Sequence, residues 1–327
     1  MTLAQAKVGM ADKVDQKVVD EFRRDSFLLD RLTFDNAVSP GTGGSTLTYG
    51  YTMLKTPSTA ARRVINAEYV AGEAVREKKT ADLDIFGGSF EVDRVIQNTS
   101  GAINEIEFQL QEKVKAAANL FHYAVVNGEV KNGSKTTAGF IESNFNGLRK
   151  LCAGTSTEVD ATGTNLYGVT NINANMDAFI LLLNQWLAKF AEKPDMILLN
   201  GDMLGVMQYI GQKMGYYERT KNDFGQDIET YKGIILVDAG KYYNGSTEVD
   251  VVATESGLTS MIGVKLGLDG FHGISPLEAS AIVKSYLPNL DAPGAVKKGE
   301  AELVAGVVLK NSRKAGILKG IQIGSTS

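Results

Sequence analysis

The sequence predicts an α+β protein that is rich in strands. Residues 82–93 largely alternate apolar and polar side chains, which is typical of a strand with one buried and one exposed face. Residues 100–126 repeat apolar side chains every three or four positions, which indicates a long amphipathic helix. The 327 residues include 35 glycines and 6 prolines, so many turns and bends are expected. A chain of this length can form two compact units, each with its own core.

The composition is that of an ordinary water-soluble protein, with 43% hydrophobic and 22% charged residues. The net charge of −4 argues against a strongly basic nucleic-acid binder. The single cysteine, Cys152, cannot form an internal disulfide, so the fold does not depend on an oxidising compartment. The first 16 residues lack the apolar core of a signal peptide, and the apolar run at 178–183 is too short to span a bilayer. We therefore expect a reducing aqueous environment and no membrane partner.

The N-terminal region has the period of an amphipathic helix over residues 11–33. Asp12 is a candidate cap, and Val14, Val18 and Phe22 recur on one face. Such a helix packs either on the protein's own core or, as an arm, on another subunit. The sequence leaves both interpretations open.

A glycine-rich segment from Pro40 then leads into a β-prone run at 46–54. Residues 55–80 are long and charged, with no leucine or phenylalanine and one isoleucine. Such a segment cannot bury enough apolar surface to pack as a unit of its own. It is either a flexible loop or a β-hairpin whose partner surface lies on another chain. The hairpin accounts for both the length and the composition.

The next segment, LDIFGGSFEVDRVI over residues 83–96, is expected to be a strand. The glycine pair at 87–88 is expected to allow a bend or a bulge. The predicted dry face carries Leu83, Ile85, Phe90 and Val92.

The long helix follows at once, with Thr99 or Ser100 as its candidate N-cap and Asn127-Gly128 as its stop. About 25 residues in a helix make a rod of about 37 Å. Its apolar stripe comprises Ile103, Ile106, Leu110, Val114, Ala117, Phe121 and Ala124.

The second half of the chain alternates shorter elements, and no internal repeat is found. Loops and short strands are expected over 129–175, and a helix from Asn175 to Phe190 with Asn173 or Asn175 near its cap. The remaining expected elements are a buried strand at 197–199, a helix at 203–213 capped by Asp202, a buried strand at 231–240, further strands to Ile274, and two strands over 302–323 joined by a turn at 313–316.

Motifs for chemistry are absent or incomplete. GEVKNGSKTT, from Gly128, has Ser134 where a phosphate-binding loop needs lysine, and GLDGFHG at 267–273 does not open a helix. His122 and His272 have no companions at metal-ligand spacing, so structural roles are expected. Cys152 has no activating neighbour and is interpreted as a small core residue. The acidic pairs Asp82/Asp84 and Glu91/Asp93 are interpreted as a solvated or subunit-facing edge. We therefore assign no catalytic, cofactor-binding or metal-binding residue.

The order of the predicted elements and three sequence segments are similar to those of a known protein family. The segments are LDIFGGSFEVDRVI at 83–96, MILLNGDMLGVMQ at 196–208 and YKGIILVDAG at 231–240. Along nearly its whole length the chain resembles the major capsid proteins of tailed bacteriophages with the Hong Kong 97-type fold. No single motif is as specific as a metal signature, and the order and the segments together make the case.

The resemblance implies a domain organisation. Residues 1–42 would form an N-terminal arm, and 43–80 an extended E-loop hairpin that reaches over the adjacent subunit. Residues 81–145 would form the peripheral P-domain, with its spine helix at 100–126. Residues 146–295 would form the axial A-domain, and 296–327 the C-terminal strands of the P-domain.

The resemblance also implies a function. The chain would be a structural head protein, not an enzyme, that assembles as hexamers and pentamers into an icosahedral shell around double-stranded DNA. It would be assembled in the bacterial host cytoplasm and reside in the virion, and it would need no cofactor. Its partners would include a portal, decoration proteins and non-specific contact with the DNA. Glycines at Gly41, Gly43 and Gly44 could let the hairpin tilt during head maturation.

Two departures from the family bear on these expectations. Some members begin with a fused scaffolding segment of about a hundred residues, whereas some 40 residues precede the hairpin here, so we expect a separate scaffolding protein or none. Some members join subunits by Lys–Asn isopeptide bonds, for which Lys55 and Asn311 are the candidates. Two alternatives stay open: an encapsulin-type compartment with the same fold and a protein cargo, and a soluble α+β enzyme, for which no convergent site is found.

Overall fold

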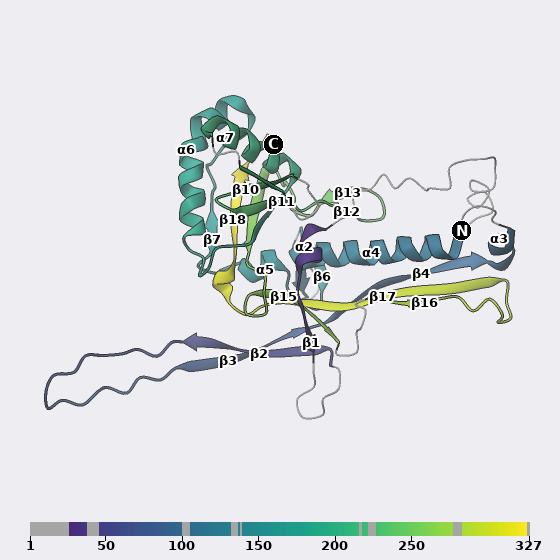
Figure 1. The fold of residues 1–327 in the computed structure, drawn as a ribbon, viewed down its shortest axis with the longest axis horizontal. Coiled ribbons are helices and arrows are strands. Elements are labelled where there is room, and N and C mark those ends of the chain that lie inside the picture. The colour runs from purple at the N-terminus through teal and green to yellow at the C-terminus, as the bar shows by residue number, and fades with distance from the viewer. Residues whose placement is uncertain are drawn as a thin grey trace.

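The computed structural model describes residues 26–37, 46–99, 105–131, 137, 139–215, 218–221, 227–276 and 283–325. The molecule is elongated (Figure 1). The helix α4 (Glu105–Asn127) and the long strands β4 (Asp84–Asp93) and β17 (Val296–Leu309) extend to one side. The hairpin of β2 (Thr48–Thr56) and β3 (Val75–Asp82) extends to the other.

Five strands form the sheet beneath α4, in the order β1-β15-β17-β16, with β4 also paired to β17. The long strand β17 organises this sheet, because β4 pairs with it antiparallel over ten residue pairs and β15 pairs with it beyond that point. The remaining strands are β1 (Phe34–Ala37), β15 (Phe271–Pro276) and β16 (Val283–Tyr286).

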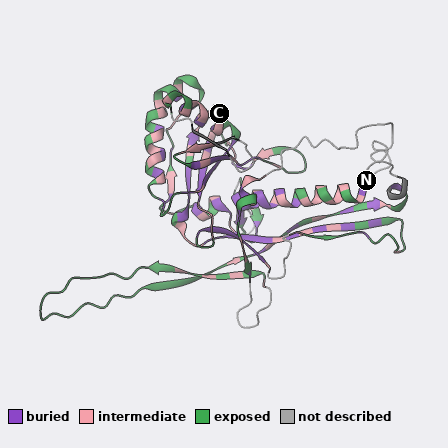
Figure 2. Ribbon diagram, in the orientation of Figure 1, coloured by how far each residue is buried: buried purple, intermediate pink, exposed green. Residues whose placement is uncertain are grey.

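The helix α4 packs on this sheet through its C-terminal half. The ring of Phe121 lies 5.4 Å from that of Phe86 and 6.2 Å from that of Phe145, between centroids. The apolar stripe is fully buried at Ala117, Phe121 and Ala124. Towards the N-terminus the same stripe is only half-buried, at Ile106, Leu110 and Val114 (Figure 2).

Seven strands form the second sheet, in the order β7-β18-β14-β8-β11-β10-β9, and the helices α6 (Gly168–Leu187) and α7 (Gly201–Met214) cover it. Its core beneath the helices contains Trp186 and Phe179 from α6 and Ile197 and Leu199 from the wholly buried strand β8. The strands are β7 (Glu158–Asp160), β8 (Met196–Leu199), β9 (Glu218–Lys221), β10 (Asp227–Tyr231), β11 (Ile234–Asp238), β14 (Leu258–Val264) and β18 (Ala315–Gln322).

No described helix is both long and apolar enough to cross a membrane.

Smaller elements connect the two sheets and the hairpin. The short elements are α2 (Phe27–Arg31), α3 (Arg94–Thr99), α5 (Leu148–Cys152), the 3-10 helix η1 (Ser312–Lys314), and two further strand pairs, β5 (Gly128–Val130) with β6 (Ile141–Ser143) and β12 (Lys241–Tyr243) with β13 (Glu248–Asp250).

The strand predicted over 83–96 differs in three ways. It ends at Asp93, where α3 begins. Phe90 and Val92 are buried as predicted, but Ile85 is 61% exposed, because it is five residues from Phe90 and a continuous strand places the two on opposite faces. The glycine pair makes no bulge, since the register with β17 is continuous through it. A Cβ on Gly87 would lie 2.2 Å from the Ala301 carbonyl oxygen, so this glycine permits a close backbone approach.

Helix starts were the other local errors. Thr99 ends α3 and therefore does not cap the long helix, while Ser100 and Ile103 lie outside the described residues. α6 begins at Gly168 instead of Asn175. α7 is capped by Asn200, whose side chain accepts the Met203 amide N–H at 2.9 Å, and Asp202 lies inside the helix.

The division into domains stays a prediction, and the sheets already depart from it in two places. β18 was expected with β17 in the P-domain, yet it pairs with β14 and β7 in the seven-stranded sheet. β15 and β16 were expected in the A-domain range, yet both pair with β17. The predicted helix at 11–33 is described only at α2, and the glycines of the predicted hinge lie outside the described residues.

Candidate assembly interface

The side chains that a catalytic or metal site would need are not brought together among the described residues. Among the described residues, no group of three His, Cys, Asp or Glu side chains could hold a metal ion. Cys152 is fully buried in the core, and burial raises the pKa of its thiol to about 12. Asp82 accepts a hydrogen bond from the Thr48 hydroxyl at 2.7 Å, and Asp84 accepts the Asn144 amide at 3.1 Å. These carboxylates hold strands and turns together.

His122 has a structural role, because it links α4 to residues from two other parts of the chain. Its Nε2 lies 2.8 Å from the Ala239 carbonyl oxygen and its Nδ1 2.9 Å from the Ser26 hydroxyl. Nε2 therefore donates, and Nδ1 accepts from Ser26, whose oxygen also caps α2 by accepting the Leu29 amide. Burial lowers the pKa of His122, so the neutral ring ties α4 to α2 and to the second sheet.

The most exposed feature of the chain is the hairpin. β2 and β3 pair antiparallel from Thr48–Asp82 to Thr56–Val75, and the chain between them continues as two extended arms without regular structure. Every residue from 54 to 80 is exposed (Figure 2). Four large side chains at its tip are between 63% and 90% exposed: Val64, Ile65, Tyr69 and Val70.

This tip contrasts with ordinary surface apolar residues, which are scattered singly. Its apolar side chains lie on a segment that contacts little of the described chain, so nothing in the described part of the subunit removes them from water. The distance they can reach is large, because 18 extended residues from Thr48 to Ile65 span up to about 60 Å. The hairpin therefore has the properties of an arm whose binding surface lies on another molecule.

The hairpin is joined to the body through a small hydrophobic cluster, which we call the hairpin root. Its buried members come from four segments, and Tyr49, Tyr51 and Ala81 of the hairpin pack against them. The Tyr49 hydroxyl donates to Asp35 at 2.7 Å. Burial and this bond raise the pKa of Tyr49. Burial alone would raise the pKa of Asp35, but the bonds from Tyr49 and the Asn36 amide lower it. The buried members are Ala37, Leu83, Ile274 and Val308.

His272 lies at this root. Its ring meets the Tyr49 ring edge-on, with centroids 5.9 Å apart, and the side chain is fully buried. Neither ring nitrogen makes a hydrogen bond of good geometry to a described residue. Burial and the nearby Lys310 ammonium lower the pKa of His272, against the opposing effects of the Gly270 carbonyl, Asp35 and Asp269. The neutral ring is thus the form that fits the root.

Comparisons with solved structures match the whole chain. The holo-SrpI encapsulin complex from Synechococcus elongatus superposes with a TM-score of 0.64 at 14% identity, covering 100% of this chain and 98% of that one. The capsid of Myoviridae phage XM1 gives 0.58 at 13% identity, covering 98% and 99%. The capsid of an empty GTA particle gives 0.55 at 13% identity, covering 97% of each. This chain has the Hong Kong 97-type fold.

No family model matches the sequence, and no curated protein matches it. The hairpin β2–β3 falls within the range for which the resemblance predicts an E-loop, and α4 covers most of the range for which it predicts a spine helix; both names stay predictions. The segments at 83–96, 196–208 and 231–240 fall on β4, on β8 with α7, and on β10 with β11.

The two candidates for an isopeptide bond lie apart in the fold. Lys55 is near the distal end of β2, with its side chain 62% exposed and its ammonium 4.0 Å from Glu77. Asn311 lies in the turn between β17 and β18, where its side chain accepts the Arg313 amide at 3.0 Å and caps η1. Within one chain neither residue has the buried, acid-assisted setting that the reaction needs.

Proposed function

We propose that this chain is the major capsid protein of a tailed bacteriophage, a structural subunit without enzymatic activity. Copies of it assemble as hexamers and pentamers into an icosahedral head that encloses double-stranded DNA. The observation that carries the proposal is the hairpin, because its apolar tip is exposed against the described part of the subunit and another molecule can bury it. The similarity to capsid and encapsulin subunits at full coverage supports the same role.

The physical basis is the area that such an arm adds. Obligate assemblies commonly bury more than about 2,000 Å² at each interface. A hairpin of this reach, laid over a neighbouring sheet, adds contact along both arms as well as at the tip. The half-buried N-terminal part of α4 and the exposed Ile85 and Val95 provide further apolar surface on the body. A contact of this kind joins two different surfaces of successive subunits, and such a head-to-tail contact closes into a ring when its rotation closes.

The remaining partners follow from the proposal. DNA contact is non-specific, because a chain of net charge −4 does not neutralise many phosphates, and packaging then depends on a motor and a portal outside this chain. A separate scaffolding protein and decoration proteins complete the assembly. Particles form in the host cytoplasm and become virions.

An encapsulin-type compartment is the second candidate, and the TM-score of 0.64 to an encapsulin favours it as a fold relative. A phage head and an encapsulin-type compartment differ in what the shell encloses. Shells isolated from the native source and treated with nuclease are expected to retain double-stranded DNA. Shells that retain one protein cargo and no DNA would identify a compartment instead.

The role of the hairpin can be tested by shortening it. The Cβ position of Gly72 lies 3.2 Å from the Thr59 hydroxyl, so the two arms are adjacent there. Replacing residues 60–71 by Asn-Gly, which favours a tight turn, removes the tip and keeps β2 and β3. We expect the shortened chain to keep its circular dichroism spectrum and to form no closed particles in electron micrographs. Closed particles of unchanged yield would show that the tip does not hold the shell together.

A further inference from the structure

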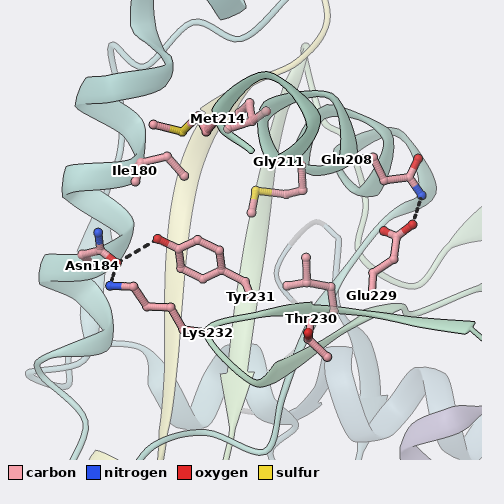
Figure 3. Close-up of a pocket in the computed structure, with 12 residues that line it drawn as sticks. Ile180, Asn184, Gln208, Gly211, Met214, Glu229, Thr230, Tyr231 and Lys232 are labelled. Carbon is pink, nitrogen blue, oxygen red and sulfur yellow. Dashed lines mark hydrogen bonds between the residues drawn. The ribbon is translucent and has the colours of Figure 1, made fainter. Parts of the chain in front are cut away.

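A cavity of 440 Å³ lies between α6, α7 and the turn that joins β10 to β11 (Figure 3). Its volume is within the range of small-molecule sites in proteins, about 300–1,000 Å³. All of its lining comes from one chain, so it does not depend on the proposed shell. The lining residues are Ile180, Asn184, Met207, Gln208, Ile210, Gly211, Met214, Glu229, Thr230, Tyr231, Lys232 and Leu236.

The body of the cavity is apolar. Figure 3 shows Ile180 and Met214 on one side of the Tyr231 ring. Met207 and Leu236 complete the lining, with little exposure of their own. Methionine side chains adapt to the shape of an apolar guest. The cavity therefore fits a hydrocarbon chain or ring better than a sugar or a nucleotide.

One end of the cavity is rich in hydrogen-bond donors. The Asn184 side-chain oxygen accepts from the Tyr231 hydroxyl at 2.8 Å and from the Lys232 ammonium at 2.7 Å (Figure 3). With that oxygen occupied, the Asn184 amide nitrogen and the remaining N–H groups of Lys232 are available to a guest. The carboxylate of Glu229 lies at the other side, where Gln208 donates to it at 2.6 Å. A guest therefore meets a positive, donating end and an apolar body.

The backbone at Lys232 supplies an independent observation. Lys232 has φ of 52° and Gly233 has φ of 68°, in the two-residue turn between β10 and β11. Such turns strongly favour asparagine, aspartate or glycine at the first position, because a left-handed backbone strains other side chains. Strained positions of this kind cluster at functional sites, so an observed one motivates a functional hypothesis. Here the lysine places its ammonium at the rim of the cavity.

We infer that this cavity binds a small amphipathic anion, with its carboxylate at Lys232 and the Asn184 amide and its hydrocarbon part along Ile180, Met207 and Met214. Charge attraction and donor geometry select the anionic head, and apolar burial holds the tail. A neutral molecule of the same length gains the binding free energy of apolar burial but lacks the charge attraction of the anionic head.

The test compares decanoate with decanol, each below its aggregation threshold, by calorimetry and thermal melting of the full chain. Decanoate is expected to bind at least tenfold more tightly than decanol and to raise the melting temperature. Lys232→Asn, which suits the turn, is expected to raise the melting temperature without ligand and to bring decanoate binding down to the decanol level. Lys232→Met is expected to remove the same preference. Lys241→Met, on β12, is the control and is expected to leave binding unchanged.

Three results would each overturn the inference. They are equal binding of decanoate and decanol to the unchanged chain, binding of neither, and retention of the decanoate preference in both Lys232 variants. A purely structural role of Lys232 in its turn would alter the melting temperature in these variants without altering the ratio of the two affinities.

Discussion

The close approach of β4 and β17 at Gly87 can be tested with a single methyl group. In Gly87→Ala the added Cβ would lie 2.2 Å from the Ala301 carbonyl oxygen and 3.2 Å from the Glu302 Cα, both backbone atoms. The strands must separate by about 0.8 Å to bring the first contact to 3.0 Å, the shortest that real Cβ atoms show. Because backbone cannot rotate away as a side chain can, the ladder between these strands has to distort.

The loss in the free energy of unfolding can be estimated from three contributions. Overpacking of this kind costs about 1–3 kcal/mol. Lengthened ladder hydrogen bonds on either side add about 1 kcal/mol each. Replacing glycine restricts the unfolded chain, which offsets about 0.4–1 kcal/mol. The free energy of unfolding is therefore expected to fall by about 2–5 kcal/mol in Gly87→Ala.

Gly88→Ala is the matched control in the same strand. Its Cβ would meet only the flexible Lys113 side chain, at 3.4 Å, which is an ordinary contact. This variant restricts the unfolded chain to the same extent without the clash, so the free energies of unfolding of the two variants should differ by about 3–5 kcal/mol. Urea denaturation followed by circular dichroism measures the difference, at one protein concentration because assembly stabilises the folded state by mass action. Equal stability of the two variants would refute the argument from close backbone approach.

Three further predictions concern the hairpin, its root and the core. The pKa of buried His272 is lowered in the folded chain, so its neutral form contributes stability that is fully present above about pH 6.5, the unfolded value, and is lost as pH falls through the lowered folded pKa. His272→Phe should therefore weaken the pH dependence of the free energy of unfolding, measured by denaturation between pH 5 and 7.5. An unchanged pH dependence would contradict this. Ile65→Asp should abolish particles in electron micrographs while changing subunit stability by less than about 0.5 kcal/mol, since Ile65 is 90% exposed; particles that persist would count against the tip as an interface. Cys152, whose thiol pKa is raised to about 12, should react with a thiol reagent only in denaturant, and rapid reaction of the native chain would show that the site opens.

Local patterns in the sequence were sufficient for most elements. The apolar period over 100–126 located α4, since apolar residues that recur every three or four positions over that length predict an amphipathic helix. The alternation of Phe90 and Val92 with charged residues gave the buried face of β4 correctly. The composition of 55–80 predicted a segment that cannot bury itself, and its residues are exposed.

Contacts between distant segments could not be predicted in this way. Nothing in the apolar runs of β17 and β18 says that the turn at Asn311 sends them to different sheets. The glycine pair was expected to bend the chain, because sequence does not show that Ala301 approaches Gly87 from 214 residues away. The contact of His272 with Tyr49 and the cavity around Tyr231 are likewise products of packing. The start of α6 was misplaced because its cap, Tyr167, makes no side-chain hydrogen bond and so leaves no signature in the sequence.

Electron microscopy of the purified, unmodified chain tests the central claim most directly. The account predicts closed particles tens of nanometres across, or rings of five and six subunits, either from the chain alone or when a scaffolding protein is expressed with it. A monodisperse monomer under both conditions, with the hairpin tip still exposed to solvent, would contradict the claim that this fold is a shell subunit.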